Sequence, residues 1–363
     1  MNRVKVSLKD RSYNILVGRG LIGQAGVIIK KLGIGKDAVV ITNKSVFAIY
    51  GKQLKSSLLK SGISVKFEFV PAGEQAKSSA VLIRLLGKIS VYDKNKTIFI
   101  VALGGGVIGD LAGFAASIYK RGIPYVQVPT TLLAQVDSAI GGKAAIDLPI
   151  AKNLAGSFYQ PKVVLSDTNV LRSLGARQIK NGLSECIKYG AIKDGRLFKY
   201  LENNYKKVLK LDEKSLAHVI LSSSSIKAKV VEEDEFDRTG ARAVLNYGHT
   251  IGHAIEAASG YSGRYEHGEA VAIGMVIAAR ISSALGLTSP AVAGRIESLV
   301  KKCGLPASIK GLKLPAIRQA LLRDKKFIRG KNRFILPTGI GAVRIVEGIS
   351  NSIIENTIKE YTE

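Results

Sequence analysis

Three of the four histidines in this chain lie close together, at positions 249, 253 and 267. His249 and His253 are four residues apart in a segment with helical periodicity, so their imidazoles project from one face of the predicted helix. His267 begins the next predicted helix and can fold back onto that face. Imidazoles that converge with a carboxylate, without thiolates, favour a zinc site that keeps one position open for substrate. Spacing alone pairs His249 with His253 as ligands, whereas a single helical histidine would be an ordinary core or surface residue.

A second candidate site follows the β-branched run at residues 97–101. Gly104, Gly106 and Gly109 satisfy the pattern GxGxxG, and the small residues of 107–119 predict a helix directly after it. A glycine turn of this kind lets a pyrophosphate approach the backbone at the N-terminus of a helix. The acidic residue that would bind a ribose about 20 positions later is missing. By itself, the motif therefore fits ordinary loop geometry better than a nucleotide site.

The predicted secondary structure changes near residue 175. Strands and helices alternate before that point, which predicts an α/β fold with a doubly wound, Rossmann-like parallel sheet. Ligands of such sheets bind at the carboxyl ends of the strands. The predicted strands are 3–8, 13–17, 37–42, 64–70, 97–101, 124–129 and 163–166, and the predicted helices are 21–32, 46–59, 78–89 and 107–119.

A helical period dominates from residue 176 onward. Only residues 333–336 and 342–346 have the pattern of strands there. We therefore expect two domains, an α/β domain over 1–175 and a mostly α-helical domain over 176–363, in agreement with the length of the chain. The predicted helices of the second domain are 177–193, 197–208, 215–232, 243–259, 268–285, 291–302 and 352–361.

The composition combines an ample apolar content with a formal net charge of +26, from 54 Lys and Arg against 28 Asp and Glu. This excess favours anionic partners, but the basic residues are spread along the chain, so a solvated basic surface is favoured over specific nucleic-acid binding. No long uncharged apolar run is present, and the N-terminus has the pattern of a strand, which predicts a soluble, cytoplasmic protein without a membrane segment. The two cysteines are too few for a disulfide framework or a thiolate zinc cluster, so a metal would need His and carboxylate ligands.

Six motifs together resemble the 3-dehydroquinate synthases of the shikimate pathway, in order and in spacing, over essentially the full chain. They are LGGGVIGDLAGFAA, VQVPTTLLAQVDSAIGGK, KNLAGSFYQP, GLSECIKYG, LNYGHTIGHAIE and HGEAVAIGM. The resemblance implies a carbon–oxygen lyase that uses NAD and Zn²⁺ or Co²⁺ to convert 3-deoxy-D-arabino-heptulosonate 7-phosphate (DAHP) into 3-dehydroquinate and phosphate. The implied cycle is transient oxidation by NAD, elimination of phosphate, return of the hydride and an intramolecular aldol reaction. We expect the first domain to bind NAD, the second to bind metal and substrate, and the chain to form a homodimer.

By motif, the resemblance assigns the metal to Glu185, His249 and His267. It places His253 beside the substrate as a proton-transfer group, in place of the ligand role that spacing suggests. A lone glutamate in a helical pattern is usually a solvated charge. The neighbours of Glu185 instead indicate a packed helix, where an unpaired carboxylate would be costly.

The implied substrate carries a carboxylate and a phosphate, which cations must hold during the chemistry. The resemblance assigns catalytic roles to His253, Lys143, Lys152, Asn153, Arg242 and Asp137, the last orienting a hydroxyl. It assigns substrate binding to Arg121, Lys188, Lys227 and Asn246. It assigns NAD binding to Asn43, Glu74, Lys77, Gly106, Val107, Ile108, Gly109, Asp110, Thr130, Thr131, Lys143, Lys152, Val170, Leu171, Arg172 and Ser173.

Two positions depart from the family pattern. Ala72 stands where an Asp is usual in the turn before Glu74, and the segment EEDEFDRTGAR is one residue longer than usual, which bears on Lys227. The segment Asp324-Lys325-Lys326 resembles a family motif in which one lysine reaches the substrate, and either lysine fits.

Two other functions are compatible with parts of this pattern. Another sugar-phosphate cyclase or a metal-dependent polyol dehydrogenase would share the NAD and metal sites, but a plain dehydrogenase needs no cationic cage such as Lys143, Lys152 and Arg242. A basic nucleic-acid-binding protein would have no use for Glu185 and the clustered histidines.

Overall fold

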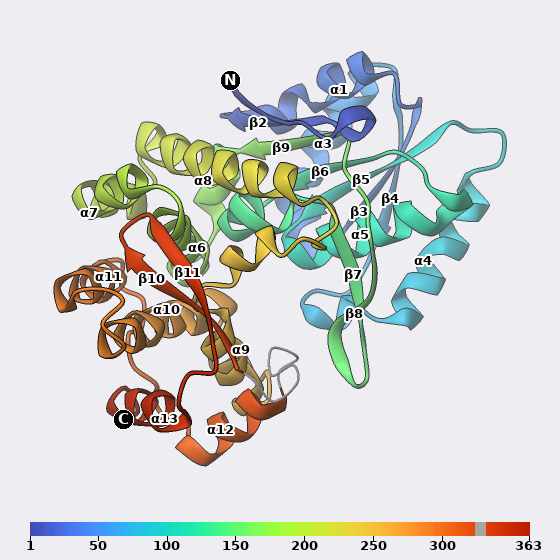
Figure 1. The fold of residues 1–363 in the computed structure, drawn as a ribbon. Coiled ribbons are helices and arrows are strands. Elements are labelled where there is room, and N and C mark those ends of the chain that lie inside the picture. The colour runs from blue at the N-terminus through green and yellow to red at the C-terminus, as the bar shows by residue number, and fades with distance from the viewer. Residues whose placement is uncertain (324–331) are drawn as a thin grey trace. The chain divides into compact units, whose positions relative to one another are not determined.

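The computed structural model describes residues 1–323 and 332–363. These residues form two compact units (Figure 1). The first consists of Met1–Leu174 and Lys227–Phe236, and the second of Gly175–Ile226 and Asp237–Glu363. The long helix α8 (Glu213–Glu233) therefore contributes residues to both units.

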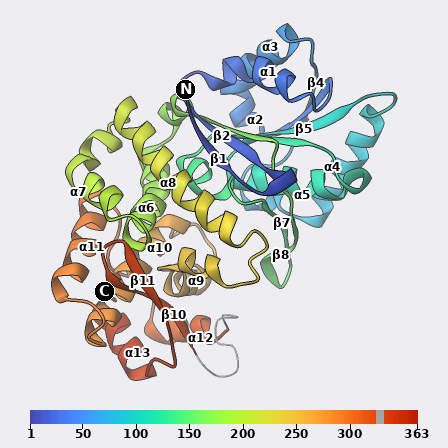
Figure 2. The ribbon, with the colours of Figure 1, turned by 45° about the horizontal axis from the view of Figure 1, so that its top comes forward.

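A seven-stranded sheet forms the centre of the first unit, in the order β1-β2-β9-β6-β5-β3-β4 (Figures 1 and 2). β1 is antiparallel to β2, and all other neighbours are parallel. Helices α4 and α5 cover one face of the sheet, and α1 and α3 cover the other. The predicted α/β fold with a Rossmann-like sheet is therefore confirmed. The elements are β1 (Asn2–Val6), β2 (Tyr13–Gly18), α1 (Leu21–Leu32), β3 (Asp37–Thr42), α2 (Lys44–Val46), α3 (Lys52–Lys60), β4 (Ser64–Phe69), α4 (Ser79–Tyr92), β5 (Ile98–Gly104), α5 (Gly106–Ile118), β6 (Tyr125–Pro129) and β9 (Val163–Asp167).

The order of the parallel strands reverses between β3 and β5. The chain passes from β3 outward to β4, then returns to β5 on the other side of β3 and continues to β6. Open α/β sheets bind ligands at such a reversal, outside the carboxyl ends of the strands. Asn43 follows β3 and Gly106 begins the helix after β5, so two predicted NAD-binding segments lie at this position.

β5 shows why this part of the sequence folds as it does. All seven of its residues are buried, because a central parallel strand is covered on both faces and must be apolar throughout. Helix α5 then packs closely on the sheet through small residues. A Cβ added to Gly113 would lie 3.0 Å from Ala144 and 3.4 Å from the ring of Tyr125.

The predicted helix 46–59 is confirmed, within a helical stretch that runs from Lys44 to Lys60 and contains a π-helical turn over Phe47–Gly51 between α2 and α3. The unassigned segment 130–162 contains a hairpin of β7 (Lys143–Leu148) and β8 (Ala151–Phe158). These strands form their own two-stranded sheet, so they lack the long apolar run that marks a buried central strand.

The second unit is mostly helical, as predicted, with one antiparallel hairpin of β10 (Arg333–Gly339) and β11 (Ala342–Glu347). The predicted continuous helix 243–259 is wrong. A 3₁₀ helix, η7 (Ala241–Asn246), is separated from α9 (His249–Ala258) by Gly248, whose φ of 78° is not helical. The other helices are α6 (Ala176–Ile192), α7 (Gly195–Leu209), α10 (His267–Ala284), α11 (Pro290–Lys302), α12 (Leu314–Arg323), which was not predicted, and α13 (Asn351–Glu360). Within residues 1–323 and 332–363, no helix is long and apolar enough to cross a membrane.

Candidate functional site

Three side chains that can hold a metal converge in the second unit. Glu185 comes from α6, and His249 and His267 are the first residues of α9 and α10. The Nε2 atoms of both histidines lie 3.8 Å from Oε1 of Glu185. Neighbouring ligand atoms of a tetrahedral zinc ion are about 3.4 Å apart when each is about 2.1 Å from the metal. One ion can therefore engage all three groups after a small movement.

Glu185 is fully buried in α6. A buried carboxylate is tolerated only with a cation or hydrogen-bond donors beside it, and the buried ammonium group of Lys188 forms an ion pair with Oε2 one helical turn away. Among the described residues, no group donates a hydrogen bond to Oε1. A buried carboxylate oxygen that faces two imidazole nitrogens, and accepts no hydrogen bond from the described residues, fits a metal ion as its partner.

The second ring nitrogen of each of these two histidines is held by a neighbour. Nδ1 of His249 lies 3.1 Å from the carbonyl oxygen of Tyr247, and Nδ1 of His267 lies 3.3 Å from Oε2 of Glu256. Such contacts orient the rings of metal-binding histidines and leave Nε2 for the metal. Sequence reasoning missed Glu256, although positions 249, 253 and 256 follow the i, i+4, i+7 spacing of one helix face.

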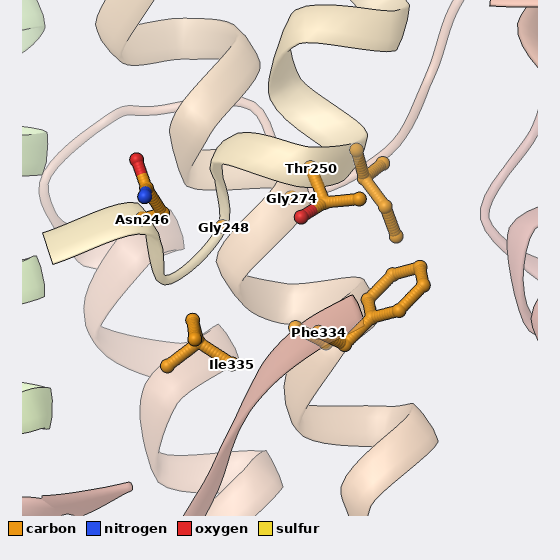
Figure 3. Close-up of a pocket in the computed structure, with 8 residues that line it drawn as sticks. Asn246, Gly248, Thr250, Gly274, Phe334 and Ile335 are labelled. Atoms are coloured by element: carbon orange, nitrogen blue, oxygen red, sulfur yellow. The ribbon is translucent and has the colours of Figure 1, made fainter. Parts of the chain in front are cut away.

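Glycines allow α9 and α10 to approach closely enough to bring the histidines together. A Cβ on Gly248 would collide with Met275, and a Cβ on Gly274 would collide with the backbone of Gly248. A small pocket lies at this contact, with Asn246 at one side of it (Figure 3). Its lining residues are Asn246, Gly248, Thr250, Ile251, Gly274, Ala278, Phe334 and Ile335.

His253 lies one turn after His249 on α9, and its side chain is exposed. Its ring centroid is 5.3 Å from that of His249 and 6.1 Å from that of His267. His253, Glu256 and His267 form a second group of donors that could hold an ion. Only the group with Glu185 contains a fully buried carboxylate, so the geometry favours that group and leaves His253 accessible to a ligand.

The other predicted residues of this unit lie on the same elements or directly before them. Lys188 is buried in α6, Arg242 is buried in η7, and Asn246 ends η7, which Tyr247 and Gly248 separate from the start of α9. The segment Asp324-Lys325-Lys326 lies outside the described residues.

Most of the predicted NAD residues of the first unit lie at the carboxyl ends of the parallel strands, whereas Lys143 and Lys152 lie on the β7–β8 hairpin. A Cβ on Gly106 would lie 2.8 Å from Oγ of Ser138, so the glycine turn is closely packed. The hydroxyl of Tyr50 donates to the carbonyl oxygen of Val170 at 2.8 Å and lies 2.5 Å from Oγ of Ser173, which fixes the 3₁₀ turn after β9. The segments are Asn43 after β3, Glu74–Lys77 after β4, Gly106–Asp110 after β5, Thr130 and Thr131 after β6, and Thr168–Ser173 after β9.

Lys77 is the centre of a polar cluster in this unit. Its buried Nζ donates to Asp110 at 2.8 Å and lies against the side chain of Asn153. The carboxylates of Glu74 and Asp147 lie 3.7 and 4.0 Å from it. Burial alone would lower the pKa of Lys77, but the three carboxylates outweigh this effect and raise the pKa. Lys77 therefore stays protonated and holds predicted site residues from α5 and β8 together.

Asp110 makes the stability of the fold depend on pH. Burial raises the pKa of its carboxyl group to about 6, although the ammonium group of Lys77 opposes the shift. The same pKa is about 3.9 in an unfolded chain. The folded protein therefore binds this proton more tightly, and the free energy of unfolding rises as the pH falls from about 6 to about 4. A gap of about two pKa units corresponds to about 3 kcal/mol.

We expect Asp110→Asn to remove this dependence. As the pH rises from about 4 to about 7, the free energy of unfolding of the variant, relative to that of the wild type, should rise by about 3 kcal/mol, because only the wild type must ionise this partly buried carboxyl group. Urea unfolding of both proteins across this range measures the difference. Parallel stability curves would contradict the prediction.

Asp137 and Lys227 form a second, largely buried pair in the first unit. Nζ of Lys227 donates to Oδ1 of Asp137 at 2.6 Å and to its carbonyl oxygen at 2.7 Å.

The two predicted site lysines of the β7–β8 hairpin lie near an aromatic ring and a carboxylate. Nζ of Lys143 is 5.9 Å from the ring centre of Phe158, and Nζ of Lys152 is 4.0 Å from the carboxylate of Glu74. Arg121 is exposed after α5, with a φ of 63°.

Comparisons with known proteins cover both units. Residues 68–181 match the family model described as 3-dehydroquinate synthase N-terminal, and residues 182–327 match the one described as 3-dehydroquinate synthase C-terminal. The 3-dehydroquinate synthase of Caldanaerobacter subterraneus subsp. tengcongensis is 47% identical over 348 residues, which cover 95% of this chain and 97% of that protein. The 3-dehydroquinate synthase of Thermodesulfovibrio yellowstonii is 43% identical and covers 99% of this chain and 100% of its own.

Solved structures with the same fold include related cyclases. A 2-deoxy-scyllo-inosose synthase in complex with carbaglucose-6-phosphate, NAD⁺ and Co²⁺ has a TM-score of 0.90 at 28% identity, over 99% of this chain and 100% of that one. A 2-epi-5-epi-valiolone synthase from Streptomyces hygroscopicus with NAD⁺ and Zn²⁺ has a TM-score of 0.88 at 26% identity, over 98% of both chains. A glycerol dehydrogenase from Schizosaccharomyces pombe shares the fold, with a TM-score of 0.69 at 20% identity over 96% of this chain and 88% of that one.

Proposed function

The chain belongs to the 3-dehydroquinate synthase family, and we propose that it converts DAHP into 3-dehydroquinate and phosphate with one bound NAD and one divalent metal ion. The observation that carries the metal requirement is the buried Oε1 of Glu185, which has two imidazole nitrogens at 3.8 Å. One carboxylate and two imidazoles, without thiolates, suit Zn²⁺ or Co²⁺ and leave a position for substrate.

Glu185, His249 and His267 would hold the metal. When bound, a divalent ion supplies the Lewis acidity that makes a substrate hydroxyl easier to ionise near neutral pH. Two neighbouring side chains support these ligands. Lys188 forms an ion pair with Oε2 of Glu185, and Oε2 of Glu256 accepts a hydrogen bond from Nδ1 of His267. Both contacts orient the ligands before any substrate enters.

His253 is the group that we assign to proton transfer. Its imidazole is exposed and belongs to the same cluster as the two ligand histidines. An imidazole exchanges protons near neutral pH, so it suits an elimination that removes a proton beside a carbonyl group.

Cationic and amide side chains would hold the carboxylate and the phosphate of the substrate. A planar guanidinium binds such groups with two parallel hydrogen bonds, and ammonium groups act as point charges. Asp137 would orient a hydroxyl, with its position fixed by Lys227. The proposed substrate residues are Arg121, Lys143, Lys152, Asn153, Lys188, Lys227, Arg242 and Asn246.

NAD would bind at the strand ends of the first unit, where it supplies a hydride acceptor that returns the hydride later in the same cycle. The glycine turn at Gly106 offers free N–H groups at the N-terminus of α5 for the pyrophosphate. The cluster of Lys77, Asp110 and Asn153 joins this turn to β8, so the cofactor segments are connected before the cofactor binds. We further propose a cytoplasmic homodimer whose charge of +26 is a solvated surface without specific affinity for nucleic acid.

An assay of phosphate release tests the proposal. The protein, freed of metal with a chelator, should release no phosphate from DAHP and NAD, and addition of Zn²⁺ or Co²⁺ should restore release. Omission of NAD should also abolish it. Phosphate release that persists without metal would contradict the assignment of the Glu185 group.

A further inference from the structure

Arg177, in the first turn of α6, forms a two-pronged contact with α10. Its Nε donates to Oε1 of Glu269 at 2.9 Å, and its Nη2 donates to Oε2 at 2.7 Å. The Nη2 atom also lies 3.2 Å from the carbonyl oxygen of Gly263 and 2.9 Å from that of Arg264. One guanidinium therefore holds both the first turn of α10 and the loop that leads into it.

The carboxylate that Arg177 holds also caps helix α10. Glu269 accepts a hydrogen bond from the backbone N–H of Glu266 at 2.9 Å, within a reciprocal capping box. Gln178, next to Arg177, donates to the side chain of Glu266 at 3.1 Å. His267 lies between these two glutamates in the sequence, so both of its flanks are tied to α6.

The same face of α6 continues toward Glu185. Asn181, one turn after Arg177, accepts a hydrogen bond from the backbone N–H of Gly268. Residues at i, i+4 and i+8 share a helix face, so Arg177, Asn181 and Glu185 form one row. The first two members contact the turn that carries His267, and the third lies 3.8 Å from its Nε2.

We propose that Arg177 is a positioning residue for the metal site, because it sets the distance between His267 and Glu185. This inference rests on the proposed binding of a metal by Glu185, His249 and His267. Arg177 is 47% exposed, and an exposed ion pair contributes little to global stability. Its effect should therefore be seen in metal affinity, because a site whose supporting contacts are lost holds its ligands loosely.

The test measures metal affinity directly. Metal-free wild type and Arg177→Ala are titrated with Zn²⁺ against a chromophoric chelator, and Arg177→Ala should bind Zn²⁺ roughly 10–100-fold more weakly. The absorption spectrum of the Co²⁺-loaded variant should also differ from that of the wild type, since the ligands are held differently. Glu269→Gln, which keeps an oxygen for the N–H of Glu266, should weaken Zn²⁺ binding in the same direction.

Arg295→Ala is the matched control in the same unit. Arg295 forms the same two-pronged contact with Glu202, at 3.0 and 2.8 Å, and is also 47% exposed. Its loss should leave the dissociation constant for Zn²⁺ unchanged. Equal constants for wild type and Arg177→Ala, or equal weakening by Arg295→Ala, would overturn the positioning role alone. A wild type that binds neither metal would overturn the proposed metal site as well.

Discussion

Glu185→Gln should lose its metal and its turnover together. The variant keeps the size of the side chain but replaces the only fully buried carboxylate of the donor group with a weak neutral ligand. The fall in affinity should exceed the roughly 10–100-fold effect of removing an outer partner. Elemental analysis of the dialysed protein measures it. Glu202→Gln, a carboxylate of α7 in the same unit, is the control and should keep full metal content.

The same substitution should also reduce stability, because it leaves Lys188 as an unpaired buried ammonium group. Breaking a buried pair by removing one partner costs about 3–5 kcal/mol. The double variant Glu185→Gln/Lys188→Met removes both charges and should recover most of this free energy of unfolding without recovering metal. Full metal content in either folded variant would contradict the assignment of Glu185.

His253→Ala should lower kcat by roughly 10²–10⁴-fold, the range expected when a general acid or base is lost. It should retain the metal, because His253 is outside the group that contains Glu185. His249→Ala, one turn earlier on α9, is the matched comparison and should lose the metal. The pH dependence of kcat should differ between the wild type and the variant, because only the wild type has this proton-transfer group.

Metal loss in the His253 variant would favour the other donor group, His253, Glu256 and His267. In that case His253 would be a metal ligand, as its spacing from His249 suggests, but together with Glu256 and His267. Retained metal with unchanged kcat would instead remove His253 from the chemistry.

Local sequence patterns predict most of the helices and strands correctly. The helix at Leu21–Leu32 and the strand at Asp37–Thr42 have the predicted bounds, because each pattern is bordered by residues that end it. Gly33 adopts a left-handed conformation after the helix, and Asn43 caps the helix after the strand. Glycine and asparagine at these positions are stop and start signals that depend on neighbours in the sequence alone.

The errors occur where tertiary contact decides the structure. Residues 243–259 have an unbroken helical pattern, but Gly248 must lie against α10 and turns the chain before His249. The break places His249 at the beginning of a helix. The break leaves no signal in the local periodicity, because the contact that causes it is with Met275, far along the chain.

The histidine cluster was visible from residue type and spacing, whereas its supports were not. Glu256 and Arg177 each contact the segment around His267 from another helix, and single charged residues on helices give no signal of such a contact. The role of Glu185 came from family resemblance. Its burial and its pairing with Lys188 now give that assignment a physical basis.

In the proposed reaction, the hydride taken from the substrate returns to it within the same cycle. The direct measurement follows phosphate and nicotinamide absorbance together during many turnovers on DAHP, with Zn²⁺ or Co²⁺ present. Phosphate should rise steadily, one per substrate consumed, while reduced nicotinamide should never exceed the amount of enzyme. Reduced nicotinamide that accumulates in proportion to product would mean an ordinary dehydrogenase and would contradict the return of the hydride.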